Sequence, residues 1–168
     1  GGDIVTEKEY SAVEYAVEFN MGAGSNSGLK YFVNENIPPV GGGNSAIGLE
    51  YQITGNLGDN PTAVGASTNA LGSLYLLYPR GSMPGGLAIV PRLGEWQHAR
   101  IVVRPDNQVE HWLNGIKVVE YVRGSPKFRE QVAKTKFKEI PNFAEWEKGR
   151  LLIQEHGHAI RFRSIKVR

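Results

Sequence analysis

The sequence predicts an all-β fold, an antiparallel β-sandwich with one short helix. Runs in which apolar and polar residues alternate recur along the chain, and this pattern is typical of half-buried strands. The 21 glycines and nine prolines punctuate these runs, which indicates many turns. The chain has 168 residues, 40% of them hydrophobic, with no internal repeat or separate linker. We therefore expect one domain over residues 1–168 that buries a sizeable core.

Four strands are predicted in the first half of the chain, at residues 13–19, 28–33, 47–53 and 72–77. The first of them reads Val-Glu-Tyr-Ala-Val-Glu-Phe and alternates clearly. Two long segments, 34–44 and 54–69, are rich in Gly, Asn and Pro and cannot supply core. Long ordered loops in a compact domain often bind ligands or cover a site, so both segments are candidates for that role.

Three further strands are predicted at residues 96–104, 108–113 and 116–121. Pro105-Asp106-Asn107 provides the first turn, and Asn114-Gly115 is a strong hairpin signal. Residues 125–138 break the strand pattern, because Ser-Pro can start a helix and apolar residues then recur with partial amphipathic spacing. This segment is the predicted short helix.

The last segment, residues 149–166, is predicted to form two strands joined by a turn at residues 156–158. Phe162 and Ile165 are expected to supply core from the second strand. The residues that lead into the turn, Gln-Glu-His, are polar. A polar cluster beside a turn at the end of buried strands is where functional sites are usually built.

Charge and cysteine content exclude several classes of protein. Nineteen basic and 17 acidic residues give a net charge of only +2, so we expect no nucleic-acid partner. The absence of cysteine excludes disulfides, thiolate nucleophiles and zinc–thiolate sites. No apolar run approaches the length of a membrane span. The chain opens with Gly-Gly-Asp rather than Met, as a processed product would.

Glu50 and Gln52 are candidate site residues, because strand alternation puts them on one face. A solvated outer face would show the same pattern, whereas the long loop that follows also suits a concave site. Asn26 and Lys30 could reach the same pocket as hydrogen-bond donors. The Asn-Ser-Gly segment at 26–28 is equally typical of an ordinary turn.

His156 is the leading candidate for proton transfer, since histidine titrates near neutral pH. It could also bind a divalent cation, Ca²⁺, Mg²⁺ or Mn²⁺, together with a carboxylate such as Glu50 or Glu155. A turn histidine that only bonds backbone is the alternative. Tyr75 and Tyr78 lie near a loop and are also candidates. No Gly-x-Ser-x-Gly, Walker, Rossmann or His-Glu-x-x-His motif is present.

Six short segments together carry a resemblance that covers nearly the whole chain. They are Asn-Ser-Gly-Leu-Lys-Tyr-Phe-Val at 26–33, Gly-Leu-Glu-Tyr-Gln-Ile at 48–53, Gly-Glu-Trp at 94–96, Trp-Leu-Asn-Gly at 112–115, Leu-Ile-Gln-Glu-His-Gly at 152–157 and Phe-Arg-Ser-Ile at 162–165. In this order and spacing they resemble the bacterial 3-keto-disaccharide hydrolase family, also described as 3-keto-glucoside lyase and hydratase.

The resemblance implies a concanavalin-A-like jelly roll with its site on the concave face of a curved sheet. It implies a carbohydrate substrate and a bacterial protein that is periplasmic, secreted or at the cell surface, whose precursor could carry a lipid anchor. The chain departs from the family at Glu155, His158 and Ser164, where Asp, a small residue and Asn are usual. The family's opening Leu-Phe-Asn-Gly-Lys-like segment is also absent, so we expect the N-terminal strand to be missing or contributed otherwise.

The resemblance further implies cleavage of 3-keto-glycosides. The ketone acidifies the C2 proton, elimination expels the glycosidic oxygen from C1, and water adds to the unsaturated sugar. We assign Glu50 and His156 as the acid/base pair, and as the ligands of a divalent cation if one is bound. The other candidates are expected to bind substrate, Gln52 and Gln154 at its hydroxyls, and Asn26, Lys30 and Arg163 at its carbonyl or ring oxygens.

Three other functions fit the same residues. A non-catalytic carbohydrate-binding module would use the same jelly roll. A conventional glycosidase would need two carboxylates about 5 to 10 Å apart, and Glu50 with Glu18 or Glu155 could supply them. A structural surface domain would bind no sugar at all.

Overall fold

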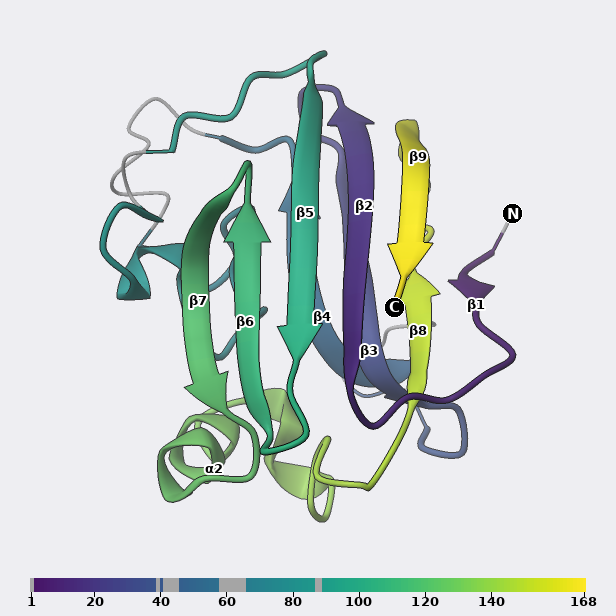
Figure 1. The fold of residues 1–168 in the computed structure, drawn as a ribbon, viewed down its shortest axis with the longest axis vertical. Helices are drawn as coiled ribbons and strands as arrows, with labels where there is room; N and C mark the ends of the chain where they lie inside the picture. Colours follow the sequence, from purple (N-terminus) through teal and green to yellow (C-terminus); the bar gives the residue numbers. More distant parts are fainter. Residues whose placement is uncertain (1, 39, 41–45, 58–65, 87–88) are drawn as a thin grey trace.

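The computed structural model of the chain is a sandwich of two antiparallel sheets (Figure 1). It describes residues 2–38, 40, 46–57, 66–86 and 89–168. The smaller sheet has the order β1 (Ile4–Val5), β8 (Arg150–Ile153), β3 (Asn26–Asn34) and β4 (Ile47–Thr54). The larger sheet has the order β7 (Ile116–Val122), β6 (Gln108–Leu113), β5 (Trp96–Val103), β2 (Val13–Met21) and β9 (Ile160–Val167). The predicted all-β sandwich of jelly-roll type is confirmed.

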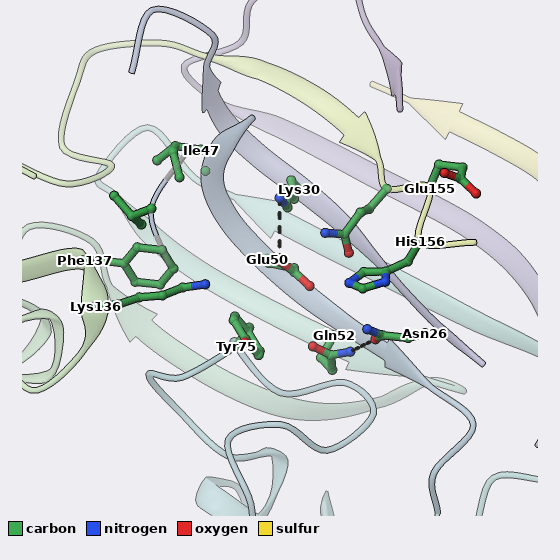
Figure 2. Close-up of a pocket in the computed structure, with 13 residues that line it drawn as sticks. Asn26, Lys30, Ile47, Glu50, Gln52, Tyr75, Lys136, Phe137, Glu155 and His156 are labelled. Atoms are coloured by element: carbon green, nitrogen blue, oxygen red, sulfur yellow. Dashed lines mark hydrogen bonds and ion pairs between the residues drawn. The ribbon is translucent and has the colours of Figure 1, made fainter. Parts of the chain in front are cut away.

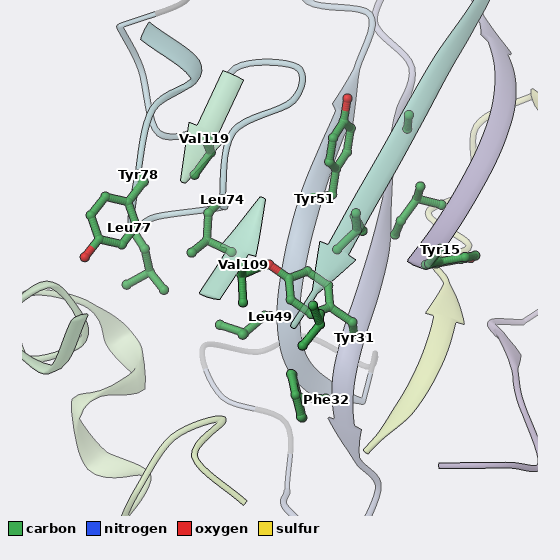
Figure 3. Close-up of a cluster of buried hydrophobic side chains, with 14 of the residues drawn as sticks. Tyr15, Tyr31, Phe32, Leu49, Tyr51, Leu74, Leu77, Tyr78, Val109 and Val119 are labelled. Carbon is green, nitrogen blue, oxygen red and sulfur yellow. The ribbon is translucent and has the colours of Figure 1, made fainter. Parts of the chain in front are cut away.

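Strand alternation sends one face of each sheet into the core. Val17 and Phe19 of β2 are buried in the core, together with Leu29 of β3. Leu49 and Tyr51 of β4 are buried in the same core (Figure 3). Because successive side chains of a strand point to opposite faces, Asn26, Gly28 and Lys30 of β3 and the even-numbered residues of β4 lie on the outer face of the smaller sheet, whereas Phe32 lies in the core after a register shift in β3. That face carries the candidate residues of the first half of the chain.

A buried hydrogen-bond network crosses the core between the sheets. The Nδ1–H of His111 donates to the Gly72 carbonyl over 3.2 Å, so Nε2 accepts from the Tyr31 hydroxyl over 2.7 Å. The Tyr31 oxygen in turn lies 2.7 Å from the Tyr121 hydroxyl. Burial lowers the pKa of His111 to about 3 and keeps its ring neutral. The network ties β3, β6 and β7 to the segment that begins at Gly72.

Local sequence signals explain the turn and the helix of the second half. Asn114 and Gly115 both have positive φ, at 51° and 82°, as a two-residue type I′ hairpin requires. The helix α2 (Pro126–Val132) begins at Ser125, whose Oγ accepts from the Phe128 N–H over 3.2 Å. The predicted helix over 125–138 is shorter than expected, because Thr135 caps a separate 3₁₀ turn, η3 (Lys136–Glu139). A second 3₁₀ turn, η1, spans Arg80–Ser82.

The strand predicted at residues 72–77 is wrong. The chain there makes isolated bridges, from Leu74 to Tyr51 on the open edge of β4 and from Leu74 to Tyr78. Leu76 has φ 63° and the N–H groups of residues 77 and 78 both donate to the Leu74 carbonyl. The chain therefore turns back on itself before a strand can form.

The hairpin predicted over residues 149–166 is also wrong, although both of its strands exist. β8 belongs to the smaller sheet and β9 to the larger one, so the connection between them crosses the edge of the sandwich (Figure 1). Phe162 packs against the core as predicted, but Ile165 is 51% exposed. Residues three positions apart on a regular strand point to opposite faces, and a bulge also interrupts β9 at this point, where Ser164 and Ile165 lie opposite the single residue Val17.

Parts of the two irregular segments lie outside the described residues. The predicted loop roles of residues 34–44 and 54–69 fall partly on residues 39, 41–44 and 58–65, which the structure does not describe. Across the described part of the chain, no helix has the length and apolar character needed to cross a membrane.

The Tyr31→Phe substitution tests the buried network. It removes the hydroxyl that joins His111 to Tyr121 and leaves buried polar atoms without that partner, so we expect a loss of about 1 to 3 kcal/mol in the free energy of unfolding. Urea unfolding followed by intrinsic fluorescence measures the loss. The matched control, Tyr10→Phe, removes a hydroxyl at a half-buried position. Equal effects of the two substitutions would contradict a stabilising role for the network.

Candidate active site

A pocket of about 460 Å³ opens on the outer face of the smaller sheet (Figure 2). This volume lies within the range of small-molecule binding sites. The floor comes from β3 and β4, with Asn26, Lys30, Ile47, Gly48, Glu50 and Gln52. The rim comes from distant parts of the chain, with Val40, Tyr75, Lys136, Phe137, Gln154, Glu155 and His156.

The pairing of β3 with β4 builds the floor. Lys30 lies opposite Glu50, and Gly28 lies opposite Gln52. Gly28 leaves room for the Glu50 side chain, because a Cβ at position 28 would lie 2.6 Å from Oε1 of Glu50 and 2.7 Å from its Cγ. The missing side chain leaves the space into which the Glu50 carboxyl folds.

Burial dominates the electrostatics of Glu50. Its side chain is 12% exposed, and Oε2 lies 3.9 Å from Nζ of Lys30. Burial raises the pKa of Glu50 to about 7, although Lys30, Lys136 and His156 all favour the charged carboxylate. Glu50 is therefore a carboxyl group that can accept or release a proton near neutral pH.

Lys30 is a buried cation on the same floor. Its side chain is 7% exposed, and its Nζ donates to the Ala46 carbonyl over 3.0 Å. Burial lowers the pKa of Lys30, and the nearby Glu50 carboxylate opposes that shift. The ammonium group supplies positive charge at the bottom of the pocket, where water is largely excluded.

Amide side chains form the next part of the floor. Nε2 of Gln52 donates to Oδ1 of Asn26 over 2.7 Å (Figure 2) and to the Ile53 carbonyl over 3.1 Å. These bonds orient the amide of Gln52, which is 5% exposed. The two amides can hydrogen-bond the hydroxyls of a ligand in a defined direction.

One rim is an extension of β8. The Gln154 N–H donates to the Gly28 carbonyl over 2.9 Å, and its carbonyl accepts from Oγ of Ser27 over 2.7 Å. These bonds hold the chain against β3 up to the turn at His156, and the ring of His156 reaches the pocket (Figure 2). His156 thus shares a pocket with Glu50, as the sequence predicted.

Glu155 lies at the pocket, but its carboxylate hydrogen-bonds within its own turn. Oε1 accepts from the Gly157 N–H over 2.7 Å, and Figure 2 shows the carboxylate directed away from Glu50. The Glu155 N–H donates to Oδ1 of Asp3 over 2.8 Å, which ties the turn to the N-terminal segment. Glu155 therefore positions the turn that carries His156.

The opposite rim holds a residue that sequence reasoning missed. Figure 2 shows the amine of Lys136, on η3, directed toward the pocket beside Tyr75. Its Nζ lies 5.5 Å from the centroid of the Tyr75 ring, and the Tyr75 N–H donates to the Glu50 carbonyl over 3.0 Å. No local pattern marks Lys136, because 86 positions of chain separate it from Glu50.

The prediction that Arg163 binds in this pocket is wrong. Arg163 lies on β9 of the larger sheet, where its Nε lies 2.6 Å from Oε2 of Glu18. Its guanidinium carbon lies 3.9 Å above the ring of Trp96. The chain crosses from β8 in the smaller sheet to β9 in the larger one, and this crossing puts the Arg163 side chain on a different surface. Tyr78 is also absent from the pocket and stacks on Tyr121 in the core.

The pocket does not fit the predicted divalent cation. Among the described residues, no group of three or more His, Asp or Glu side chains could hold a metal ion. Glu50 already faces the ammonium group of Lys30, and Lys136 adds a second positive charge. A dication would be repelled by these lysines, so we assign no metal to Glu50 and His156.

The arrangement is suited to proton transfer next to a developing negative charge. A carboxyl that titrates near neutrality and an imidazole can exchange protons with a ligand. Two ammonium groups can stabilise an oxygen that becomes negative during the reaction.

Proteins that are similar to this chain carry names from carbohydrate chemistry. The sequence profile described as the 3-keto-alpha-glucoside-1,2-lyase-like domain matches residues 1–168. The 3-keto-disaccharide hydrolase of Bacteroides thetaiotaomicron is 26% identical over 185 aligned residues, which cover 100% of this chain and 62% of that protein. The chain thus spans less than two thirds of the length of this relative.

Solved structures share the fold. Two crystal structures from Parabacteroides distasonis, each described as a "putative glycosyl hydrolase", are 26% identical to this chain. They superpose with TM-scores of 0.76 and 0.70, over 98% and 99% of this chain and 73% and 82% of theirs. A carbohydrate binding module from Bacillus subtilis has a TM-score of 0.50 at 6% identity, over 99% of this chain and 81% of its own. This last similarity shows the fold alone.

The burial of Glu50 predicts a pH-dependent stability. The pKa rises from 4.5 in the unfolded chain to about 7 in the native state, so the native state binds the proton more tightly. The stabilisation that protonated Glu50 gives to the native state is complete at pH values below the pKa in the unfolded chain. It is lost as the pH rises through the pKa in the native state. Relative to Glu50→Gln, the wild type should lose about 3 kcal/mol of unfolding free energy across that interval.

Denaturant unfolding at a series of pH values measures this difference. The control is Glu147→Gln, which removes an exposed carboxyl far from Glu50 in the sequence. Identical pH dependence in the wild type and in Glu50→Gln would show that Glu50 does not titrate near neutrality.

Proposed function

The chain belongs to the family of 3-keto-alpha-glucoside-1,2-lyase-like domains, and from this membership we propose that its pocket cleaves 3-keto-disaccharides and related 3-keto-glycosides. The name of the Bacteroides relative supports this substrate class. The observation that carries the proposal is the buried Glu50, whose pKa is raised to about 7 beside Lys30 and Lys136. Removing a proton next to a ketone requires such a base and positive charge at the ketone oxygen.

The proposed reaction has two stages. In the first, Glu50 takes the C2 proton and the C–H electron pair forms a C2–C3 double bond while the ketone oxygen becomes an enolate. The enolate then re-forms the ketone, a C1–C2 double bond forms, and the C1–oxygen bond breaks. His156 gives a proton to the departing oxygen. The product is an unsaturated 3-keto sugar and the free leaving group.

The second stage restores the acid and the base. Water adds through its oxygen to C1, and His156 takes the proton that the water releases. Protonated Glu50 returns a proton to C2. The sum consumes one water and yields 3-ketoglucose, and both residues regain their starting protonation states.

The remaining floor residues bind and orient the sugar in this proposal. Lys30, Lys136 and Asn26 lie on the pocket surface where they can contact the ketone or ring oxygens, and Lys136 takes the role first assigned to Arg163. Gln52 and Gln154 would hold the hydroxyls, since backbone contacts fix their positions. We further propose that the protein acts outside the bacterial cytoplasm, as exported members of such a family would.

A conventional glycosidase is disfavoured by the position of the carboxylates. Glu18 lies on the larger sheet in an ion pair with Arg163, and the Glu155 carboxylate accepts a hydrogen bond within its own turn. Neither faces Glu50 across the pocket, although two opposed carboxylates are what ordinary glycoside hydrolysis requires.

The first test is incubation of the protein in D₂O with a 3-keto-disaccharide and, separately, with its unoxidised parent. We expect cleavage of the keto substrate alone, with deuterium at C2 of the released 3-ketoglucose by NMR, because the proton that Glu50 takes exchanges with D₂O before Glu50 returns one to C2. Glu50→Gln and His156→Gln should each lower kcat by about 10²- to 10⁴-fold. The rate should rise with pH through about 7, where Glu50 becomes the charged base.

3-Ketoglucose alone in the same buffer is the control for exchange without the enzyme. Cleavage of the unoxidised parent would point instead to an ordinary glycosidase. Binding of sugar without cleavage of either compound would favour a carbohydrate-binding module.

Gly28→Ala tests the space beneath Glu50. The added Cβ would meet the Glu50 carboxyl at 2.6 Å, and the flexible side chain rather than the backbone must move. We expect kcat/KM on the keto substrate to fall at least about tenfold because the base is displaced, while thermal unfolding remains cooperative. Gly22→Ala is the matched control, since nothing lies within 4 Å of a Cβ there. Full activity of Gly28→Ala would show that the position of the carboxyl does not matter.

A further inference from the structure

A second hollow of about 480 Å³ adjoins the pocket and shares Asn26, Gln52 and Tyr75 with it. We propose that this groove binds the other sugar ring of a disaccharide substrate, the ring that leaves with the glycosidic oxygen. The inference rests on the proposed function and adds a second sugar-binding subsite to it. The groove lies along the end of β4 and the segment near residues 67–70.

The groove has the chemistry of a neutral sugar site. Besides the three shared residues, its polar walls come from Thr54, Asn56, Ser67 and Asn69. None of its lining residues in the described part of the chain carries a charge. Amides and hydroxyls present both donors and acceptors, which suits the hydroxyls of a sugar and gives no advantage to an anionic ligand.

Local hydrogen bonds hold the two asparagines in place. Oγ1 of Thr54 accepts from the Asn56 N–H, and Oγ of Ser67 accepts from the Asn69 N–H, each over 3.1 Å. Oγ of Ser73 also donates to the Ser67 carbonyl over 3.0 Å. These hydroxyls therefore hydrogen-bond to the backbone, while the exposed side chains of Asn56 and Asn69 can contact a ligand.

The distribution of charge sets the direction in which the substrate binds. Every ionisable group that the proposed reaction uses, Glu50, Lys30, Lys136 and His156, lines the first pocket and not the groove. The keto ring must therefore lie in the first pocket. The glycosidic bond then lies near the shared residues Asn26, Gln52 and Tyr75, and the second ring extends over Asn56 and Asn69.

The experiment compares a 3-keto-disaccharide with methyl 3-ketoglucoside, whose leaving group is too small to reach the groove. We measure kcat/KM for both substrates in the wild type, Asn56→Ala and Asn69→Ala. Each substitution should lower the ratio of the disaccharide value to the methyl-glucoside value by about tenfold, the effect of one lost hydrogen bond. Asn36→Ala, at an exposed turn away from both hollows, should leave the ratio unchanged.

Other outcomes separate this inference from the proposed function. Turnover of both substrates with an unchanged ratio in both variants would overturn the subsite while the proposed function stands. If the wild type turns over neither substrate, the proposed function fails. The groove is then tested by NMR titration with the unoxidised disaccharide. Shifts of the Asn56 and Asn69 side-chain amides that disappear in the Ala variants would support the groove, and their absence at saturating sugar would overturn it.

Discussion

The withdrawal of the Glu50 carboxyl from water is the constraint on which the site depends. A charged carboxylate is costly to bury, and this cost raises the pKa of Glu50 to about 7. The nearby lysines offset part of the cost without removing it. The same burial that makes the group unfavourable as an anion makes it a base of useful strength near neutral pH. Stability and proposed activity are thus opposed at one residue.

The sandwich supplies a rigid floor for this arrangement. The inner faces of β3 and β4 are fixed in the core by Tyr31, Leu49 and Tyr51, so their outer faces present Lys30 and Glu50 in a fixed register. The network from Tyr31 through His111 to the Gly72 carbonyl extends that rigidity to the segment that carries Tyr75. Sites on rigid strands hold reacting groups more accurately than sites on loops alone.

The rim is built by segments that lie far apart in the sequence. η3 brings Lys136 to one side, and the turn after β8 brings His156 to the other. β8 then passes to β9 in the larger sheet, and this crossing explains why Arg163 lies beside Glu18 instead of in the pocket. The neutral groove with Asn56 and Asn69 extends the same outer surface beyond the charged groups.

The sequence by itself determined most of the strands, the hairpin at Asn114 and the shared face of Glu50 and Gln52, because each follows from local alternation or turn chemistry. It also identified the polar residues near His156, because they lie beside a turn at the end of an apolar strand. Only the tertiary structure decided which sheet each strand joins. It therefore decided that Arg163 lies outside the pocket and that Lys136 lies at its rim. It likewise decided the pKa of Glu50 and the poor fit to a metal ion. These properties depend on burial and on contacts between distant segments, which no local pattern of residues encodes.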